Sequence, residues 1–183
     1  MNLKTRQEYD LVRSCLTGSE SAFKALFDMF APTMMAVCNR YAVDRCEAED
    51  WMQEGFIKAF NNLGSFKFEG SFEGWLRRIM VNTALKHLNK PSRKLEQTEL
   101  DQFLDTGYNG EILSTLAVEE IIKVVNELPE GYKTVFYLNV IEGYNHKEIS
   151  EKLGITESTS RSQLVKAKKA LKNKLHKIMK IAG

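Results

Sequence analysis

The stretch YNHKEISEKLGITESTSRSQLVKAKKAL, residues 144–171, decides the fold of the C-terminal part of the chain. Asn145 is followed three residues later by Glu148, which is the spacing of a helix N-cap and its capping-box partner. Gly154 suits the left-handed position that ends a helix, and Thr156 can cap a second helix after a tight turn. A helix, a glycine-containing turn and a second helix make a helix-turn-helix, and the sequence therefore predicts one here.

The second helix of this motif has two chemically different sides when its residues are placed about 100° apart. The side that we expect to be buried is small and apolar: Ser160, Leu164, Ala167, Leu171, Leu175 and Ile178. The opposite side and its margins are small and hydroxylated first and cationic further along, and we predict that they contact DNA: Ser158, Thr159, Arg161, Ser162, Val165, Lys166 and Lys169. Small residues let a helix enter the major groove, Arg161 can reach a guanine edge, and lysines can meet phosphates. The alternative is a solvated basic helix, but such a helix more often mixes Glu with Lys, and no acidic residue follows Glu157.

Charge is segregated along the 183 residues, although the net charge is only +2. Residues 1–90 carry 12 basic and 11 acidic side chains, residues 91–130 carry 3 and 9, and residues 131–183 carry 11 and 4. The three segments therefore have net charges of +1, −6 and +7. This places the polyanion-binding candidate in the last segment.

Composition indicates a folded protein of the cytoplasm. An apolar fraction of 43% with ten Phe is enough to bury a core. No apolar stretch approaches the roughly 20 residues that span a bilayer, and the N-terminus lacks the apolar run of a signal peptide. Cys15, Cys38 and Cys46 form no CxxC pair and have no histidine cluster nearby, so we expect reduced thiols and no zinc site.

The sequence offers no catalytic arrangement. His87, His146 and His176 are scattered and lack a nearby carboxylate or cysteine, and we expect His146 and His176 to be solvated. No phosphate-binding glycine loop and no metal-ligand spacing occurs. We therefore predict that the protein is not an enzyme and that it uses no cofactor and no metal.

Helical periodicity dominates the chain, and no convincing alternating strand occurs. The expected landmarks are a helix capped by Ser19, a helix at about 47–63, a Gly-rich loop at 62–70, a helix capped by Ser71 that ends near Asn89, and a helix opened by Pro129. We predict an all-α fold of two small helical domains, residues 10–90 and 116–181, joined by an acidic linker at 91–115.

The stretch AEDWMQEGFIKAF, residues 48–60, separates into two sides on a helix. Asp50, Glu54 and Ile57 share the side opposite the apolar one, with Gln53 and Trp51 at its margins. A fully solvated side seldom carries both Ile57 and Trp51, which favours docking onto a basic partner surface. Packing against the preceding helix is an equally good interpretation of the pattern alone.

The stretch at residues 64–90 interleaves aromatic and cationic side chains. Single-stranded nucleic acid is bound by such sets, because rings stack on unpaired bases while cations follow the backbone. Phe72 and Trp75 lie on one helical side and are better explained as core. Phe66 and Phe68, in the Gly-flanked loop, are the better candidates for exposure.

Three stretches in this order, residues 48–60, 71–88 and 128–171, resemble the sigma-70 superfamily, specifically the extracytoplasmic-function (ECF, group IV) sigma factors. The resemblance covers roughly residues 10–90 and 116–178. It implies a region-two helix that docks on the coiled coil of the RNA polymerase β′ subunit, a helix and loop that act on the −10 element, and a region four that reads the −35 element. It thus implies a transcription initiation factor that binds core RNA polymerase (β′ and β subunits) and promoter DNA, and an anti-sigma factor as a further partner.

The resemblance also implies residue roles. The polymerase-docking positions are Asp50, Gln53, Glu54 and Ile57, and the −10 positions are Lys67, Phe68, Ser71, Arg78, Asn82 and Lys86. In region four, Arg161, Ser162, Val165 and Lys166 match contacting positions of the recognition helix. The chain departs from the family pattern at Trp51, where a smaller aliphatic is usual, at Gly55, and at residues 158–160, where Ser-Thr-Ser replaces Gly-Thr-Val.

The rival class is a conventional helix-turn-helix repressor or activator that does not bind core polymerase. It would explain residues 131–178 equally well. It would not explain the acidic and apolar side of residues 48–60, so we favour the initiation factor.

Overall fold

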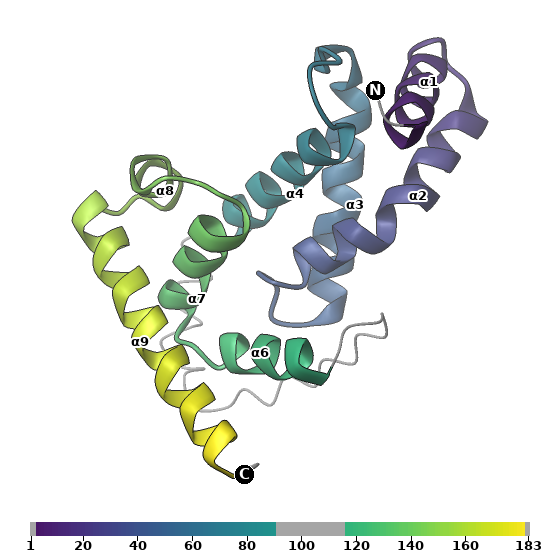
Figure 1. The fold of residues 1–183 in the computed structure, drawn as a ribbon. Coiled ribbons are helices and arrows are strands. Elements are labelled where there is room, and N and C mark those ends of the chain that lie inside the picture. Colours follow the sequence, from purple (N-terminus) through teal and green to yellow (C-terminus); the bar gives the residue numbers. More distant parts are fainter. Residues whose placement is uncertain (1–2, 91–115, 182–183) are drawn as a thin grey trace. The chain divides into compact units, whose positions relative to one another are not determined.

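The chain is described by a computed structural model that covers the backbone of residues 3–90 and 116–181, and side chains within 6–90 and 121–176. Throughout these ranges the regular elements are helices, which confirms the all-α prediction (Figure 1). The chain divides into two compact units, Met1–Thr106 and Gly107–Gly183. The expected domain limits, 10–90 and 116–181, stay predictions, and the expected linker at 91–115 lies outside the described residues.

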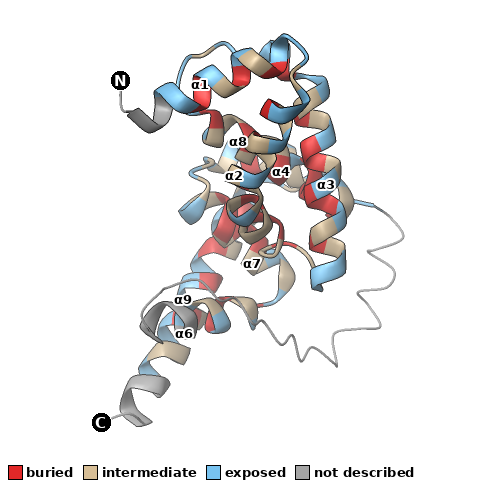
Figure 2. Ribbon diagram, turned by 90° about the vertical axis from the view of Figure 1, so that its right-hand side faces the viewer, coloured by how far each residue is buried: buried red, intermediate tan, exposed pale blue. Residues whose placement is uncertain are grey.

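Within residues 3–90, the N-terminal unit contains four α-helices and a short 3-10 turn. They are α1 (Leu3–Leu16), α2 (Glu20–Cys38), α3 (Arg45–Asn61), the turn Leu63–Ser65 and α4 (Phe72–Leu88). Helix α3 packs along α4, and α2 contacts α1, α3 and α4. Buried segments, drawn red, occur along α2, α3 and α4 (Figure 2). Large side chains that are fully or almost fully buried hold this unit together: Leu26, Phe30, Met34, Phe72, Leu76 and Met80.

Side-chain caps begin these helices where the sequence predicts them. The Ser19 hydroxyl accepts from the amide of Ala22, and the Ser71 hydroxyl accepts from the amide of Gly74 at 3.3 Å. Both predicted caps are confirmed. Helix α3 begins at Arg45, two residues before the expected start, because Asp44 accepts from a first-turn amide at 2.8 Å and so serves as its cap.

The described part of the C-terminal unit, residues 116–181, contains four α-helices and one π-helical turn. They are α6 (Leu116–Asn126), α7 (Glu130–Phe136), the turn Tyr137–Ile141, α8 (His146–Leu153) and α9 (Glu157–Ile181). Helix α9 packs against α6, α7 and α8. The core of the C-terminal unit includes Val135, Leu138, Ile149 and Ala167, all with no exposed surface.

The predicted helix-turn-helix is confirmed in α8 and α9. The Asn145 side chain accepts from the amide of Glu148 at 3.0 Å, and the Glu148 carboxylate accepts from the amide of Asn145 at 2.8 Å. Gly154 ends α8 in the left-handed conformation, with φ 65°. The Thr156 hydroxyl caps α9 by accepting from the amide of Thr159 at 3.0 Å.

The cysteines are free thiols: Cys15 and Cys38 are buried and Cys46 is exposed. Burial raises the pKa of the Cys38 thiol to about 12, so it stays protonated and unreactive. Within the described residues no group of three or more His, Cys, Asp and Glu side chains could hold a metal ion. No helix in the same ranges combines the length and the hydropathy that crossing a membrane requires.

Candidate functional site

The outer side of α3 is exposed and carries both acidic and apolar groups. Asp50, Gln53 and Ile57 are exposed, and 60% of the Ile57 surface is open to solvent. Trp51 is only 2% exposed, and its ring stacks on His87 of α4 with centroids 5.3 Å apart. The expectation that Trp51 contributes to the outer side is therefore wrong, because the indole packs between α3 and α4.

Glu54 lies at the edge of this side and is held by a lysine and a histidine of its own unit. Its Oε1 is 2.7 Å from Lys58 Nζ, and its Oε2 is 2.6 Å from His87 Nε2. The hydrogen bond from Lys58, followed by that from His87, lowers the pKa of the Glu54 carboxyl to about 2. The carboxylate is thus ionised at neutral pH, and both of its oxygens have a partner.

The expectation that His87 lacks a nearby carboxylate is wrong. Glu54 and His87 are 33 positions apart in the sequence, but α3 and α4 pack side by side and bring them together. Lys58 extends this network, because its ammonium also donates to the Thr83 hydroxyl of α4 at 3.0 Å.

Gly55 of α3 lies directly against the Met80 side chain of α4. A Cβ added at this position would lie 2.2 Å from Met80 Sδ, well inside van der Waals contact. The departure from a helix-forming residue at position 55 is therefore explained by this close approach.

The loop before α4 is only partly open. Phe66 is 6% exposed, and its ring centroid is 5.4 Å from that of Phe72 and 5.6 Å from that of Trp75. The expectation that Phe66 is exposed is therefore wrong, because it completes an aromatic cluster with α4. Phe68 is half-buried, and its φ of 58° is unusual for a residue with a bulky side chain.

Tyr9 of α1 holds this loop in its strained conformation. Its hydroxyl oxygen lies 2.9 Å from the carbonyl oxygen of Phe68 and 2.7 Å from that of Gly70, so it can donate to either. The left-handed conformation of Phe68 costs about 1–2 kcal/mol, which these contacts help to offset. Helix α1 was not among the helices predicted from the sequence, although Tyr9, Val12 and Cys15 recur at every third position and are all buried.

Two adjacent hollows lie beside this loop and along α4. One, of about 390 Å³, is lined by Ser65, Phe66, Lys67, Glu69, Gly70, Ser71, Gly74, Trp75 and Arg78. The other, of about 490 Å³, is lined by Lys58, Asn62, Ser65, Trp75, Ile79, Asn82, Thr83 and Lys86. The two hollows share Ser65 and Trp75.

The predicted −10 residues divide between these hollows. Lys67, Ser71 and Arg78 line the smaller hollow, whereas Asn82 and Lys86 line the larger one. Phe68 lines neither, because its ring packs edge-on against Tyr9 with centroids 5.2 Å apart. Five of the six residues are thus brought into one continuous region.

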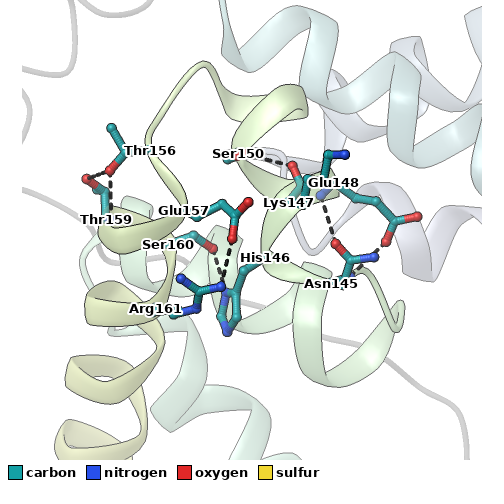
Figure 3. A network of polar contacts seen from close by, with 10 residues as sticks. All are labelled: Asn145, His146, Lys147, Glu148, Ser150, Thr156, Glu157, Thr159, Ser160 and Arg161. Atoms are coloured by element: carbon teal, nitrogen blue, oxygen red, sulfur yellow. Dashed lines mark hydrogen bonds and ion pairs between the residues drawn. The ribbon is translucent and has the colours of Figure 1, made fainter.

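Helix α9 presents the side that the sequence predicts for DNA. Ser160, Leu164, Ala167 and Leu171 are buried and Leu175 is half-buried, whereas the side chain of Ile178 lies outside the described residues. The opposite side is exposed at Ser158, Arg161, Ser162, Val165, Lys166 and Lys169 and half-buried at Thr159. The Arg161 guanidinium donates to the Glu157 carboxylate at 2.7 Å (Figure 3). Val165 is 66% exposed.

His146 connects the two helices of the motif. Its Nδ1 is 2.9 Å from the hydroxyl oxygen of Ser160, and its side chain is half-buried (Figure 3). The expectation of a solvated His146 is therefore wrong, whereas His176 is exposed as expected. The turn between α8 and α9 produces this contact across 14 residues.

Comparison with known proteins identifies both units. Residues 26–94 match the family model of sigma-70 region 2, and residues 118–171 match that of sigma-70 region 4. The ECF RNA polymerase sigma-E factor of Haemophilus influenzae is 31% identical over 181 residues, covering 92% of this chain and 95% of that protein. The RNA polymerase sigma-H factor of Pseudomonas aeruginosa is 26% identical, covering 98% of this chain and all of that protein.

Two solved structures share the fold. The sigma factor RpoE of Bartonella quintana, solved in complex with the anti-sigma factor NepR, matches with a TM-score of 0.57 at 19% identity, covering 84% of this chain and 96% of that one. CnrH, solved in complex with the cytosolic domain of CnrY, matches with a TM-score of 0.50 at 18% identity, covering 91% and 95%. Together with the sequence relatives, these matches show that the chain belongs to the sigma-70 family and is an ECF sigma factor.

Proposed function

We propose that this protein binds core RNA polymerase and directs it to −35/−10 promoters as a transcription initiation factor. The observation that carries the proposal is the presence of sigma-70 region 2 and region 4 in one chain, in the family's order. A conventional helix-turn-helix repressor or activator would account for the second match alone. The initiation factor accounts for both.

The outer side of α3 is the proposed polymerase-docking surface, formed by Asp50, Gln53, Glu54 and Ile57. An exposed isoleucine flanked by carboxylates suits a basic partner surface with an apolar centre. Glu54 would add negative charge, although both of its oxygens already have partners. We therefore assign the direct contacts to the three exposed residues.

The two hollows are the proposed site for unpaired −10 bases. Trp75, expected in the core, is only half-buried; it lines both hollows and offers a ring for stacking. Lys67, Arg78 and Lys86 supply positive charge for the strand. Each stacked base contributes about 1–3 kcal/mol, which favours the melted promoter. The Tyr9 contacts would keep the loop preformed.

Helix α9 is the proposed reader of the −35 element. Its small residues at the start allow close approach to the major groove, and Arg161 can donate to a guanine edge. Lys166 and Lys169, on the same exposed side, would contact phosphates.

We also propose that the protein is not an enzyme, needs no cofactor and acts in the cytoplasm with the polymerase. RpoE and CnrH were solved with an anti-sigma factor and with the cytosolic domain of CnrY, respectively. We propose that this chain has an anti-sigma partner as well.

Capture of core polymerase tests the proposed docking surface. Asp50→Ala and Ile57→Ser should each weaken binding about tenfold or more if these exposed residues are central contacts. Asp28→Ala is the matched control, since Asp28 is an exposed carboxylate of α2 outside this surface. Wild-type protein that fails to bind core polymerase, or fails to start transcription from any member of a randomised promoter library, would refute the proposed function.

A further inference from the structure

Ser160 is a polar residue on the buried side of α9. It has no exposed surface, and it stands where the family pattern usually has valine. A buried hydroxyl without a hydrogen-bond partner is destabilising, so a serine at this position requires a partner. The His146 ring supplies it at 2.9 Å.

His146 is well placed to fix that partner in space. It is the first residue of α8, directly after Asn145, whose capping box with Glu148 is complete. The cap defines the backbone from which the imidazole projects, and the ring meets Ser160 in the first turn of α9 (Figure 3). The bond therefore links the starts of the two helices.

The position of the bond along α9 gives it a consequence for DNA reading. Ser160 lies directly before Arg161, the residue proposed to reach a base edge. Apolar contacts between α8 and α9 have little directional preference, whereas a hydrogen bond favours one distance and one angle. A bond at Ser160 thus restricts rotation of α9 about its own axis where Arg161 leaves the helix.

We propose that His146 and Ser160 form a positioning pair that sets the rotation of α9 relative to α8, and thereby the −35 specificity of this protein. Neither residue contacts DNA in this role. The inference rests on the proposed function, because it concerns how α9 reads the −35 element.

Run-off transcription by full-length protein with core polymerase tests the pair. A promoter is first selected by the wild type from a randomised library, and a second template keeps its −10 element but has a scrambled −35 element. The measured quantity is the ratio of transcript from the two templates. His146→Ala and Ser160→Val should each lower this ratio about three- to tenfold, the factor expected for one lost side-chain hydrogen bond.

Two further variants separate positioning from general stability. His146→Asn keeps a polar group near the place of Nδ1 and should restore most of the ratio. The double variant His146→Ala/Ser160→Val should lose no more than either single variant, because both remove the same bond. His176→Ala is the matched control, since it removes an exposed imidazole from α9 and should leave the ratio unchanged.

In all variants, the amount of transcript from the scrambled template and the binding to core polymerase should equal those of the wild type. That result would support a role of the pair in −35 reading. An unchanged ratio in His146→Ala and Ser160→Val would overturn the inference alone. An equal fall on both templates without recovery in His146→Asn would also overturn it, since the bond would then serve folding only. A wild type without any −35 preference would overturn the proposed role of α9 together with the inference.

Discussion

Replacement of Gly55 by alanine places two effects of known size in opposition. In a helix interior alanine is more favourable than glycine by about 1 kcal/mol. The added Cβ, however, would lie 2.2 Å from Met80 Sδ and 3.0 Å from Met80 Cε. Met80 has no exposed surface, so its thioether would have to shift within the buried core.

The packing effect should be the larger of the two. Inserting one methyl group into a filled core costs about 1–3 kcal/mol, and here the closest contact is far below van der Waals distance. We expect Gly55→Ala to lower the free energy of unfolding of the N-terminal unit by about 1 kcal/mol after the gain in helix propensity. For a unit of this size that corresponds to a fall in Tm of about 5 °C.

Gly74 of α4 provides the matched control. The nearest atom to a Cβ at Gly74 is Ser71 Cβ at 3.9 Å, which is an ordinary contact. Gly74→Ala should therefore keep the gain in helix propensity and raise the free energy of unfolding of the N-terminal unit by about 0.5–1 kcal/mol. The two substitutions are chemically identical, so their difference isolates the contact with Met80.

Urea unfolding of the full-length chain, followed by tryptophan fluorescence, measures the difference. Both tryptophans of the chain, Trp51 and Trp75, lie in α3 and α4, so the signal reports the N-terminal unit alone. In a Met80→Ala background, which opens space, Gly55→Ala should become stabilising. If Gly55→Ala is as stable as Gly74→Ala in the wild-type background, a Cβ at position 55 does not collide with Met80, and the prediction is refuted.

Three further predictions concern charge and the proposed DNA contacts. The pKa of Glu54 is lowered from its ordinary value of 4.5 to about 2. The ionised carboxylate therefore stabilises the fold at pH values above 4.5, and this stabilisation is lost as the pH falls towards about 2. Since 35% of the side chain is exposed, we expect only about 1 kcal/mol, and Glu54→Gln should flatten urea stability between pH 5 and 3. Tyr9→Phe removes the hydroxyl contacts to the loop and should speed amide hydrogen exchange at residues 66–70. It should also weaken transcription from double-stranded promoters more than from pre-melted ones. Exchange rates equal to those of the wild type would contradict the role of Tyr9 in holding the loop. Arg161→Ala should relax preference at one −35 base by about 1–3 kcal/mol, whereas Lys166→Ala should weaken all sequences alike and reduce the salt slope by about 1. A base-specific effect of Lys166→Ala in promoter binding would count against this assignment.

Local rules predicted the starts of α2, α4 and α8 and the exposed side of α9. The caps by Ser19, Ser71 and Asn145 and the left-handed Gly154 are confirmed, because each depends on bonds within about four residues. The buried side of α9 is confirmed at Ser160, Leu164, Ala167 and Leu171 for the same reason, since one helix repeats every 3.6 residues whatever it packs against. The roles of the predicted site residues stay predictions.

Contacts between helices could not be predicted in this way. The bond between Glu54 and His87 joins two helices, and Tyr9 contacts Phe68 across 59 residues. Such pairs depend on the rotation and crossing of two helices, which the periodicity of either helix does not contain. The error at Phe66 has the same origin, because its burial depends on the aromatic rings of α4.

Two of the departures from the family pattern lie on α3, and both are accounted for by α4. Trp51 stacks on His87, and Gly55 leaves room for Met80. Trp51, with its large side chain, and Gly55, with none, thus both fit the surface of α4 that α3 packs against. They change how α3 packs without altering the outer side, and they should have little effect on polymerase docking.

The departure at Ser160 has a different consequence, although it too has a specific partner in His146. Replacing Ser160 by the valine usual in the family would leave the His146 ring facing an apolar group. Changing His146 alone would leave a buried hydroxyl unpaired. We therefore expect the two residues to be coupled, so that the effect of changing one depends on the identity of the other. Because Ser160 adjoins Arg161, this is the departure that lies next to the proposed DNA-reading surface.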